Sequence, residues 1–163
     1  MDKLGIRIIG GNDFMGIMSG NTESVKNELK ASIKHSKTAK SDYEYIIDNE
    51  DKFDNVKYYI YIPYKLNLDT ETLEYILAHE RGHIELRHLE DCHSYNVCMK
   101  DEYAADEYTM NEIGFEKTFN GLLKLDSAYK SEFGKMHGIP YLEDRLDNLL
   151  IVSGLGLDDD LNN

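Results

Sequence analysis

The chain has 163 residues and a formal net charge of -13, with 31 acidic and 18 basic side chains. Direct binding to nucleic acid or to an anionic membrane is not expected, because phosphate groups bind clustered Lys and Arg side chains. The charge suits a basic protein partner instead. The length allows a hydrophobic core without disulfides, and we expect a single domain over residues 1–163.

Two cysteines, Cys92 and Cys98, are too few for a disulfide scaffold, so we expect free thiols in a reducing compartment. The first residues lack the apolar core of a signal peptide, and no run approaches the roughly 20 apolar residues of a membrane span. We therefore expect a soluble, cytoplasmic protein. Residues 158–163 are acidic and polar, and they are predicted to form a disordered tail.

The N-terminal third is predicted to form a small antiparallel sheet with one helix. Candidate strands are short segments rich in β-branched and aromatic residues, at 4–9, 14–18, 43–48 and 56–64. Apolar residues four apart predict a helix over residues 22–35. Pro63 cannot donate a ladder hydrogen bond, so we expect the last strand either to end there or to lie at a sheet edge, where a peptide can add as an extra strand.

The remaining two thirds are predicted to be helical, which makes the fold class α+β and mainly helical. Apolar residues recur at helical spacing over 70–89, 99–113, 115–133 and 141–152. The first of these helices has Asp69 or Thr70 as its N-cap and Glu71 in its first turn. Gly114 is expected to end the second helix.

The first of these helices carries an HExxH pattern formed by His79, Glu80 and His83. The two histidines are four residues apart, so one helix face offers two imidazoles to one tetrahedral metal ion. Glu80 is rotated about 100° from His79 and suits a general base that acts on a metal-bound water. The alternative is an ordinary amphipathic helix that carries these residues by chance, because the pattern is short.

A catalytic zinc ion needs a third protein ligand beside an open position. A metzincin has its third histidine six residues after His83, but this position is Leu89, so that class is excluded. If the helix continues, His88 points away from the ligand face and is expected at the surface, and His93 in the following turn stays an alternative. The stronger candidate is Glu102 on the next helix.

Asp106 lies four residues after Glu102 and therefore shares its helix face. We expect Glu102 to bind the metal and Asp106 to accept a hydrogen bond from the far nitrogen of a ligating histidine. Ala105 is small enough to let the two helices approach closely. Asp101 and Glu107 are expected at the surface, where charged residues usually lie.

These two motifs resemble the gluzincin group of zinc metallopeptidases and, within it, the ImmA/IrrE family. Residues 138–149 are similar to the helix with arginine and leucine near the end of that family, and the resemblance covers residues 56–157. Family members often have asparagine at the position of Asp106. The resemblance implies a zincin-like fold, one zinc ion per chain and site-specific cleavage of a basic DNA-binding repressor of the helix-turn-helix class.

The predicted reaction is metal-assisted peptide hydrolysis. Zinc held by the three ligands lowers the pKa of its water, and Glu80 takes the proton and passes it to the leaving amine. A further donor to the oxyanion is expected from His137, Tyr141 or Arg145, and we favour His137. Arg145 can equally pair with an acidic residue and hold its helix in place.

Two further interpretations stay open. An interaction module that binds its partner without cutting it would use the same acidic surface. Cys92, His93 and Cys98 would form a small structural zinc site, which lacks a clear fourth ligand. Metal content and a cleavage assay distinguish an enzyme from an interaction module, because a binder associates stoichiometrically and leaves its partner intact.

Overall fold

The computed structural model describes residues 6–11, 18–21, 57–63, 65–91 and 98–155. The chain divides into two compact units, Met1–Leu66 and Asn67–Asn163. The prediction of one domain over the whole chain stays a prediction. The predicted helix over 22–35, the predicted strand over 43–48 and the predicted tail over 158–163 lie outside the described residues.

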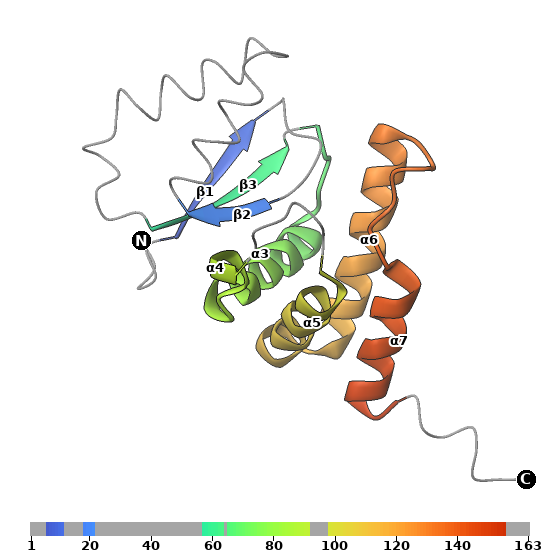
Figure 1. Cartoon of the computed structure of the whole chain (residues 1–163). Helices are drawn as coiled ribbons and strands as arrows, with labels where there is room; N and C mark the ends of the chain where they lie inside the picture. The colour runs from blue at the N-terminus through green and yellow to red at the C-terminus, as the bar shows by residue number, and fades with distance from the viewer. Residues whose placement is uncertain (1–5, 12–17, 22–56, 64, 92–97, 156–163) are drawn as a thin grey trace, which may run out of the picture. The chain divides into compact units, whose positions relative to one another are not determined.

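The first unit contains a three-stranded sheet in the order β1, β3, β2 (Figure 1). These strands are β1 (Ile6–Gly11), β2 (Met18–Asn21) and β3 (Tyr58–Pro63). β1 runs parallel to β3, with Ile6 opposite Tyr58, and β2 runs antiparallel to β3, with Met18 opposite Tyr61. The sheet is therefore mixed, and the prediction of an antiparallel sheet is wrong for β1.

β3 ends at Pro63, as one of the two alternatives predicted. It is the central strand of this sheet, so the alternative prediction of an edge strand is wrong. That prediction depended on Pro63, which lacks a backbone N–H donor. Pro63 is the last residue of β3, so the missing donor interrupts no further pair of the ladder. Consecutive strand residues point to opposite faces, and Tyr59 and Ile60 are both buried, so neither face of β3 is exposed at this point.

The second unit is helical, as predicted for the last two thirds of the chain. Its helices are α3 (Thr70–Glu85), α4 (His88–Asp91), α5 (Met99–Ile113), α6 (Phe115–Phe133) and α7 (Leu142–Ser153). α5 and α6 have the predicted bounds, and α7 begins and ends one residue later than predicted. Among the described residues, no helix has both the length and the apolar character needed to span a bilayer.

α3 begins at the predicted N-cap, Asp69. The Asp69 side chain accepts a hydrogen bond from the Thr72 backbone N–H at 2.7 Å, which satisfies one of the free donors of the first turn. Lys124 of α6 donates to both Asp69 and Glu71. The hydrogen bonds from Thr72 and Lys124 lower the pKa of Asp69 to about 2, so the cap is ionised at neutral pH.

α3 ends four residues before the predicted position. The Leu86 backbone N–H donates to the Gly82 carbonyl at 3.0 Å, and Arg87 follows with a φ of 60°. A non-glycine residue rarely adopts this left-handed conformation, which cannot continue a right-handed helix. The chain therefore turns at Arg87, and the short helix α4 starts at His88.

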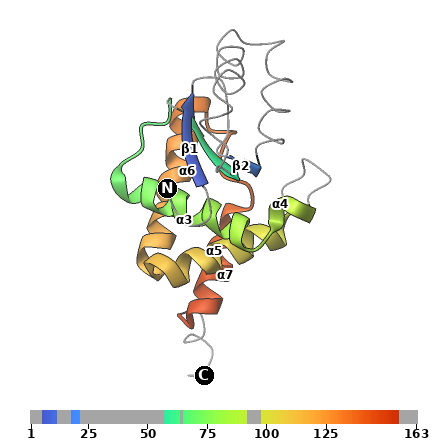
Figure 2. The ribbon, with the colours of Figure 1, turned by 90° about the vertical axis from the view of Figure 1, so that its left-hand side faces the viewer.

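The long helices of the second unit pack against one another (Figure 2). α3 contacts α5 and α6, and α7 also contacts α5 and α6. All four contribute buried apolar side chains, which are Tyr75, Ile76, Ile84, Ala105, Leu122, Leu125, Tyr129 and Leu149. Because the burial of apolar surface is the main favourable contribution to folding, these contacts fix how α3 and α5 lie beside each other.

α6 approaches α3 closely at Gly121. A Cβ atom at this position would lie 2.4 Å from the Cβ atom of Tyr75, a distance that real side chains do not reach. Tyr75 is 1% exposed and cannot move without disturbing its neighbours. Gly121 is therefore required by the packing of the two helices.

We expect Gly121→Ala to destabilise the protein by about 1–3 kcal/mol, because an added methyl group overpacks a close helix contact. Alanine is the better helix former by about 1 kcal/mol, so helix propensity alone would give the opposite sign. Urea unfolding followed by circular dichroism measures the difference, with Ser131→Ala on the exposed side of α6 as the control. A Gly121→Ala protein as stable as the wild type would contradict this packing.

Candidate metal centre

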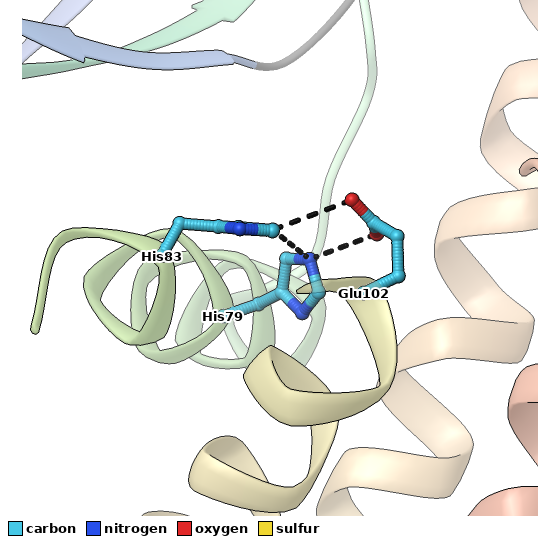
Figure 3. Close-up of side chains that lie close together, drawn as sticks. All are labelled: His79, His83 and Glu102. Carbon is cyan, nitrogen blue, oxygen red and sulfur yellow. Dashed lines mark hydrogen bonds and ion pairs between the residues drawn. The ribbon is translucent and has the colours of Figure 1, made fainter. Parts of the chain in front are cut away.

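Two histidines one turn apart on α3 point toward one another (Figure 3). The Nε2 atoms of His79 and His83 lie 3.1 Å apart, as expected for residues four apart on one helix face. His79 is 6% exposed, and the side chain of His83 is 12% exposed. The pair is nearly enclosed by protein and directs two nitrogen atoms to one point.

Glu102 of α5 completes a group of three donors (Figure 3). Its carboxylate oxygens lie 3.3 Å from His79 Nε2 and 3.4 Å from His83 Nε2. Two ligand atoms that bind a tetrahedral ion at about 2.0–2.1 Å are separated by about 3.3 Å. The three contacts are close to this separation, with a different Glu102 oxygen at each histidine. One ligand atom from each residue lies within 4.8 Å of the other two, so the group can hold a metal ion.

The close approach of α3 and α5 brings these donors together. A Cβ atom on Gly82 would lie 3.2 Å from the Cα atom of Ala105 and 3.3 Å from its carbonyl oxygen, which is tighter than an ordinary contact. Ala105 is fully buried, in agreement with the role expected from its small size. A ring carbon of Tyr108 would lie equally close, at 3.2 Å. The helices therefore meet closely at Gly82, and Glu102, one turn before Ala105, reaches the histidines of α3.

Asp106 lies behind His79, as predicted. Its Oδ1 atom is 2.9 Å from His79 Nδ1, an ion-pair contact that would hold the proton of a neutral His79 on Nδ1, so that Nε2 could bind a metal. The Tyr75 hydroxyl donates to the same oxygen at 3.1 Å. Tyr75 was not predicted, although its spacing was a usable signal, because Tyr75, His79 and His83 follow one another at intervals of four residues.

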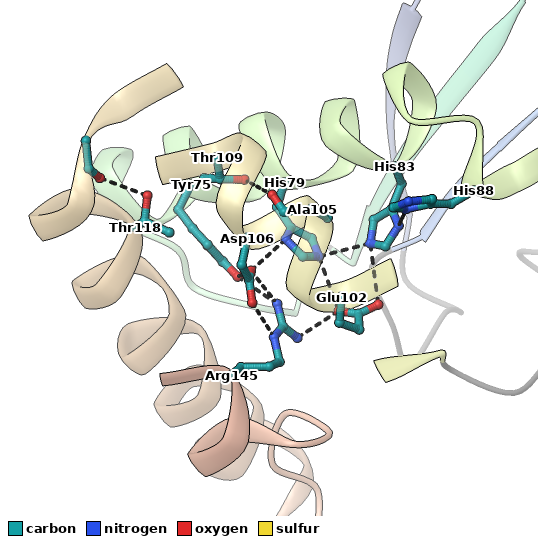
Figure 4. Close-up of polar contacts among 11 residues, drawn as sticks. Tyr75, His79, His83, His88, Glu102, Ala105, Asp106, Thr109, Thr118 and Arg145 are labelled. Atoms are coloured by element: carbon teal, nitrogen blue, oxygen red, sulfur yellow. Dashed lines mark hydrogen bonds and ion pairs between the residues drawn. The ribbon is translucent and has the colours of Figure 1, made fainter. Parts of the chain in front are cut away.

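Arg145 of α7 joins both carboxylates of the site (Figure 4). Its Nε and Nη2 atoms donate to the two oxygens of Asp106 at 2.7 and 2.8 Å, and its Nη1 atom lies 2.8 Å from Glu102 Oε2. Nη2 also donates to the Tyr75 hydroxyl at 3.0 Å. Arg145 is 4% exposed, and its guanidinium forms buried, charge-assisted hydrogen bonds with the two carboxylates. Of the two roles that the sequence left open, these contacts favour the structural one.

The contacts set the charges of the group. Burial alone would lower the pKa of His79, but the carboxylates of Asp106 and Glu102 outweigh it and raise the pKa to about 9. Burial opposes the ionisation of Glu102 and Asp106, yet His79 and Arg145 hold the pKa of both carboxyl groups below the usual range. Two carboxylates and one guanidinium leave one negative charge, which a proton on His79 neutralises and which attracts a metal cation.

The two predicted catalytic residues lie in different surroundings. Glu80 follows His79 on α3 and is 8% exposed. His137 is exposed in the connection between α6 and α7, where its backbone N–H donates to the Gly134 carbonyl at 2.9 Å. In the described part of the chain, no contact joins His137 to the three donors, and its catalytic role stays a prediction. Tyr141 at the start of α7 is also exposed.

One residue expected at the surface, His88, lies instead beside a donor and is contacted by Asp101. The Nδ1 atom of His88 is 3.0 Å from His83 Nδ1, and the His88 side chain is 14% exposed. Burial and the neighbouring His83 lower the pKa of His88. Asp101 Oδ1 lies 3.8 Å from His88 Nε2. The expectation that His88 points away from the ligand face is wrong, because α3 does not continue to this residue.

The alternative ligands fall partly outside the described residues. Cys92 and His93 are not described, so a structural zinc site with Cys98 is not tested. Cys98 itself is an exposed free cysteine that precedes the first turn of α5.

No protein-family model, curated protein or solved structure matches this chain. The resemblance to the ImmA/IrrE family therefore depends on the sequence motifs alone.

We expect Arg145→Met to destabilise the metal-free protein by about 3–5 kcal/mol, because it leaves the carboxylates of Glu102 and Asp106 buried without their guanidinium partner. Lys117→Met is the matched control, since it removes an exposed ion pair with Glu74 that is expected to contribute less than about 1 kcal/mol. Urea unfolding at neutral pH measures both variants. Losses of equal size would show that the Arg145 network contributes no more than a surface pair.

We expect the metal-free protein to lose stability as the pH rises above neutrality. The pKa of His79 is about 9 in the folded chain and 6.5 ordinarily, so its protonation stabilises the fold fully below pH 6.5, and this contribution disappears as the pH passes 9. A shift of this size corresponds to about 3 kcal/mol. Urea unfolding of chelator-treated protein across this range measures the loss, and His79→Gln should not show it. A constant unfolding midpoint in the wild type would contradict the charge assigned to His79.

Proposed function

We propose that the protein is a zinc-dependent endopeptidase with a zincin-like fold. The observation that carries this proposal is the convergence of His79, His83 and Glu102, which offer one ligand atom each within 4.8 Å of one another, with Glu80 directly after His79 in the sequence of α3. Three protein ligands leave the fourth position of a zinc ion open, which distinguishes a catalytic site from a closed structural one. The same helix thus supplies both the metal ligands and the candidate base.

The donor set favours zinc over harder cations. Two imidazole nitrogens and one carboxylate oxygen suit zinc, whereas magnesium and calcium prefer ligands that are all oxygen. Bound by these three residues, zinc would polarise the scissile carbonyl and increase the acidity of the attacking water. Asp106 and Arg145 hold the ligands in place, because Asp106 fixes the tautomer of His79 and Arg145 pairs with Glu102.

Glu80 acts as the general base and then as the general acid. It accepts a proton from the attacking water and delivers this proton to the nitrogen of the leaving amine, so that one carboxylate serves both proton transfers. Glu80 as a whole residue is 8% exposed, so little of it is in contact with bulk water. We keep His137 as a candidate donor to the oxyanion, on the basis of its position in the connection that precedes α7.

The substrate that we propose is a basic helix-turn-helix repressor in the cytoplasm. The resemblance to the ImmA/IrrE family implies this class, and the net charge of -13 favours a partner with an excess of Lys and Arg. Electrostatic attraction of this kind speeds association and weakens as salt is added. The alternative is an interaction module that binds the same partner without cutting it.

Metal analysis and one incubation separate these two functions. Protein purified without chelators is analysed for zinc, and then incubated with the purified helix-turn-helix repressor encoded nearest to its gene, with new N-termini identified by mass spectrometry. We expect about one zinc ion per chain and cleavage at one or a few peptide bonds, both abolished by a chelator and restored by added zinc. Stoichiometric association with an intact repressor would instead establish the interaction module.

We expect Glu80→Gln to retain zinc and to abolish cleavage, because glutamine has nearly the same shape but cannot accept the proton of the attacking water. Loss of a general base typically lowers the rate by a factor of about 100 or more. Glu85→Gln is the matched control, since Glu85 is exposed at the end of the same helix and is expected to leave cleavage unchanged. Turnover in Glu80→Gln at the wild-type rate would remove Glu80 from the mechanism.

A further inference from the structure

The turn between α3 and α4 brings His88 back beside His83 (Figure 4). On an uninterrupted helix, a residue five positions after His83 would be rotated by about 140° from it and could not contact its ring. Arg87 adopts a φ of 60° and ends this continuity. The two Nδ1 atoms consequently lie 3.0 Å apart, with the rings inclined at 69°.

The position of His83 in the site determines which nitrogen carries its proton. His83 Nε2 faces His79 Nε2 at 3.1 Å and Glu102 at 3.4 Å, so a metal bound by the three donors occupies this nitrogen. A neutral histidine that binds a metal through Nε2 keeps its proton on Nδ1. The atom that faces this N–H is Nδ1 of His88, which must therefore accept the hydrogen bond.

Acceptance at Nδ1 places the proton of neutral His88 on Nε2, on the side of Asp101. The Asp101 carboxylate lies 3.8 Å from this nitrogen and belongs to α5, next to the donor Glu102. The side chains are 12% exposed for His83, 14% for His88 and 32% for Asp101, so the chain of contacts runs from the protein interior toward solvent. His88 is not itself a candidate ligand of this ion, because the ring of His83 separates it from the Nε2 atoms.

We propose that His88 is a positioning residue that accepts the Nδ1 proton of His83 and thereby fixes the tautomer in which His83 Nε2 binds the metal. This inference rests on the proposed metal site and extends it. His79 has the equivalent partner in Asp106, so each imidazole donor is oriented by a different neighbour. One partner is a carboxylate within the core, and the other is a neutral imidazole on a separate helix. Partners of this kind typically change metal affinity by a factor of about 10–100 when they are removed.

Histidine NMR of the zinc-loaded wild-type protein tests the assignment directly, because nitrogen chemical shifts distinguish the two neutral tautomers. We expect His83 to carry its proton on Nδ1 and His88 to carry its proton on Nε2. A His88 ring with its proton on Nδ1 would overturn the proposal, since it could not accept from His83. This measurement needs no substitution and therefore does not depend on the folding of a variant.

Two substitutions at position 88 then separate positioning from simple packing. His88→Leu fills space without an acceptor, whereas the Oδ1 atom of His88→Asn can replace the Nδ1 acceptor. We expect the zinc dissociation constant, measured by competition with a chromophoric chelator, to rise about 10-fold or more in His88→Leu. His88→Asn and the control Glu85→Gln should stay close to the wild type.

Equal affinities in the wild type and His88→Leu, or equal losses in both His88 variants, would overturn the role of His88. If the wild type binds zinc, either of these results leaves the proposed peptidase function untouched, because both concern only the role of His88. A wild-type protein that binds zinc with the expected dependence on His88 but cuts no repressor would contradict the peptidase and support the positioning role. A wild type that binds no zinc would overturn both.

Discussion

The contact of α3 with α5 at Gly82 and Ala105 is the constraint on which the site depends. A side chain added at Gly82 would force its neighbours on α5 to shift, and the same close contact holds Glu102 against His79 and His83. Glycine inside a helix costs stability relative to alanine, by about 1 kcal/mol. Gly82 lies in the turn of α3 between His79 and His83, where these two side chains meet the carboxylate of Glu102 from α5.

The site also depends on the charges of Glu102, Asp106 and Arg145. Glu102 and Asp106 are two carboxylates close together in the interior, an arrangement that is unfavourable without a compensating charge. Arg145 of α7 supplies that charge and contacts both carboxylates. Helix α7 therefore stabilises the site although it contributes none of the three candidate ligands. The remaining negative charge favours a cation between the histidines and Glu102, which connects the stability of the helical unit to metal binding.

The sequence predicted those features that depend on spacing within one helix. The pairs His79 with His83 and Glu102 with Asp106 follow from residues four apart, and the bounds of α5 and α6 follow from apolar periodicity and glycine. The strand order was not predictable, because pairing between distant segments leaves no local pattern. The position of His88 was missed because the turn before it has no sequence marker. Arg87 adopts the left-handed conformation there, whereas glycine or asparagine usually occupies such a position.

X-ray absorption at the zinc edge, on protein loaded with one equivalent of zinc, tests the central claim most directly. The account predicts a first shell of nitrogen and oxygen atoms at about 2.0–2.1 Å, with the outer-shell scattering of two imidazoles, and the loss of one imidazole in His83→Ala. A shell with sulfur at about 2.3 Å would place the ion at cysteine instead, and zinc that is removed by dialysis would mean that the three donors hold no metal.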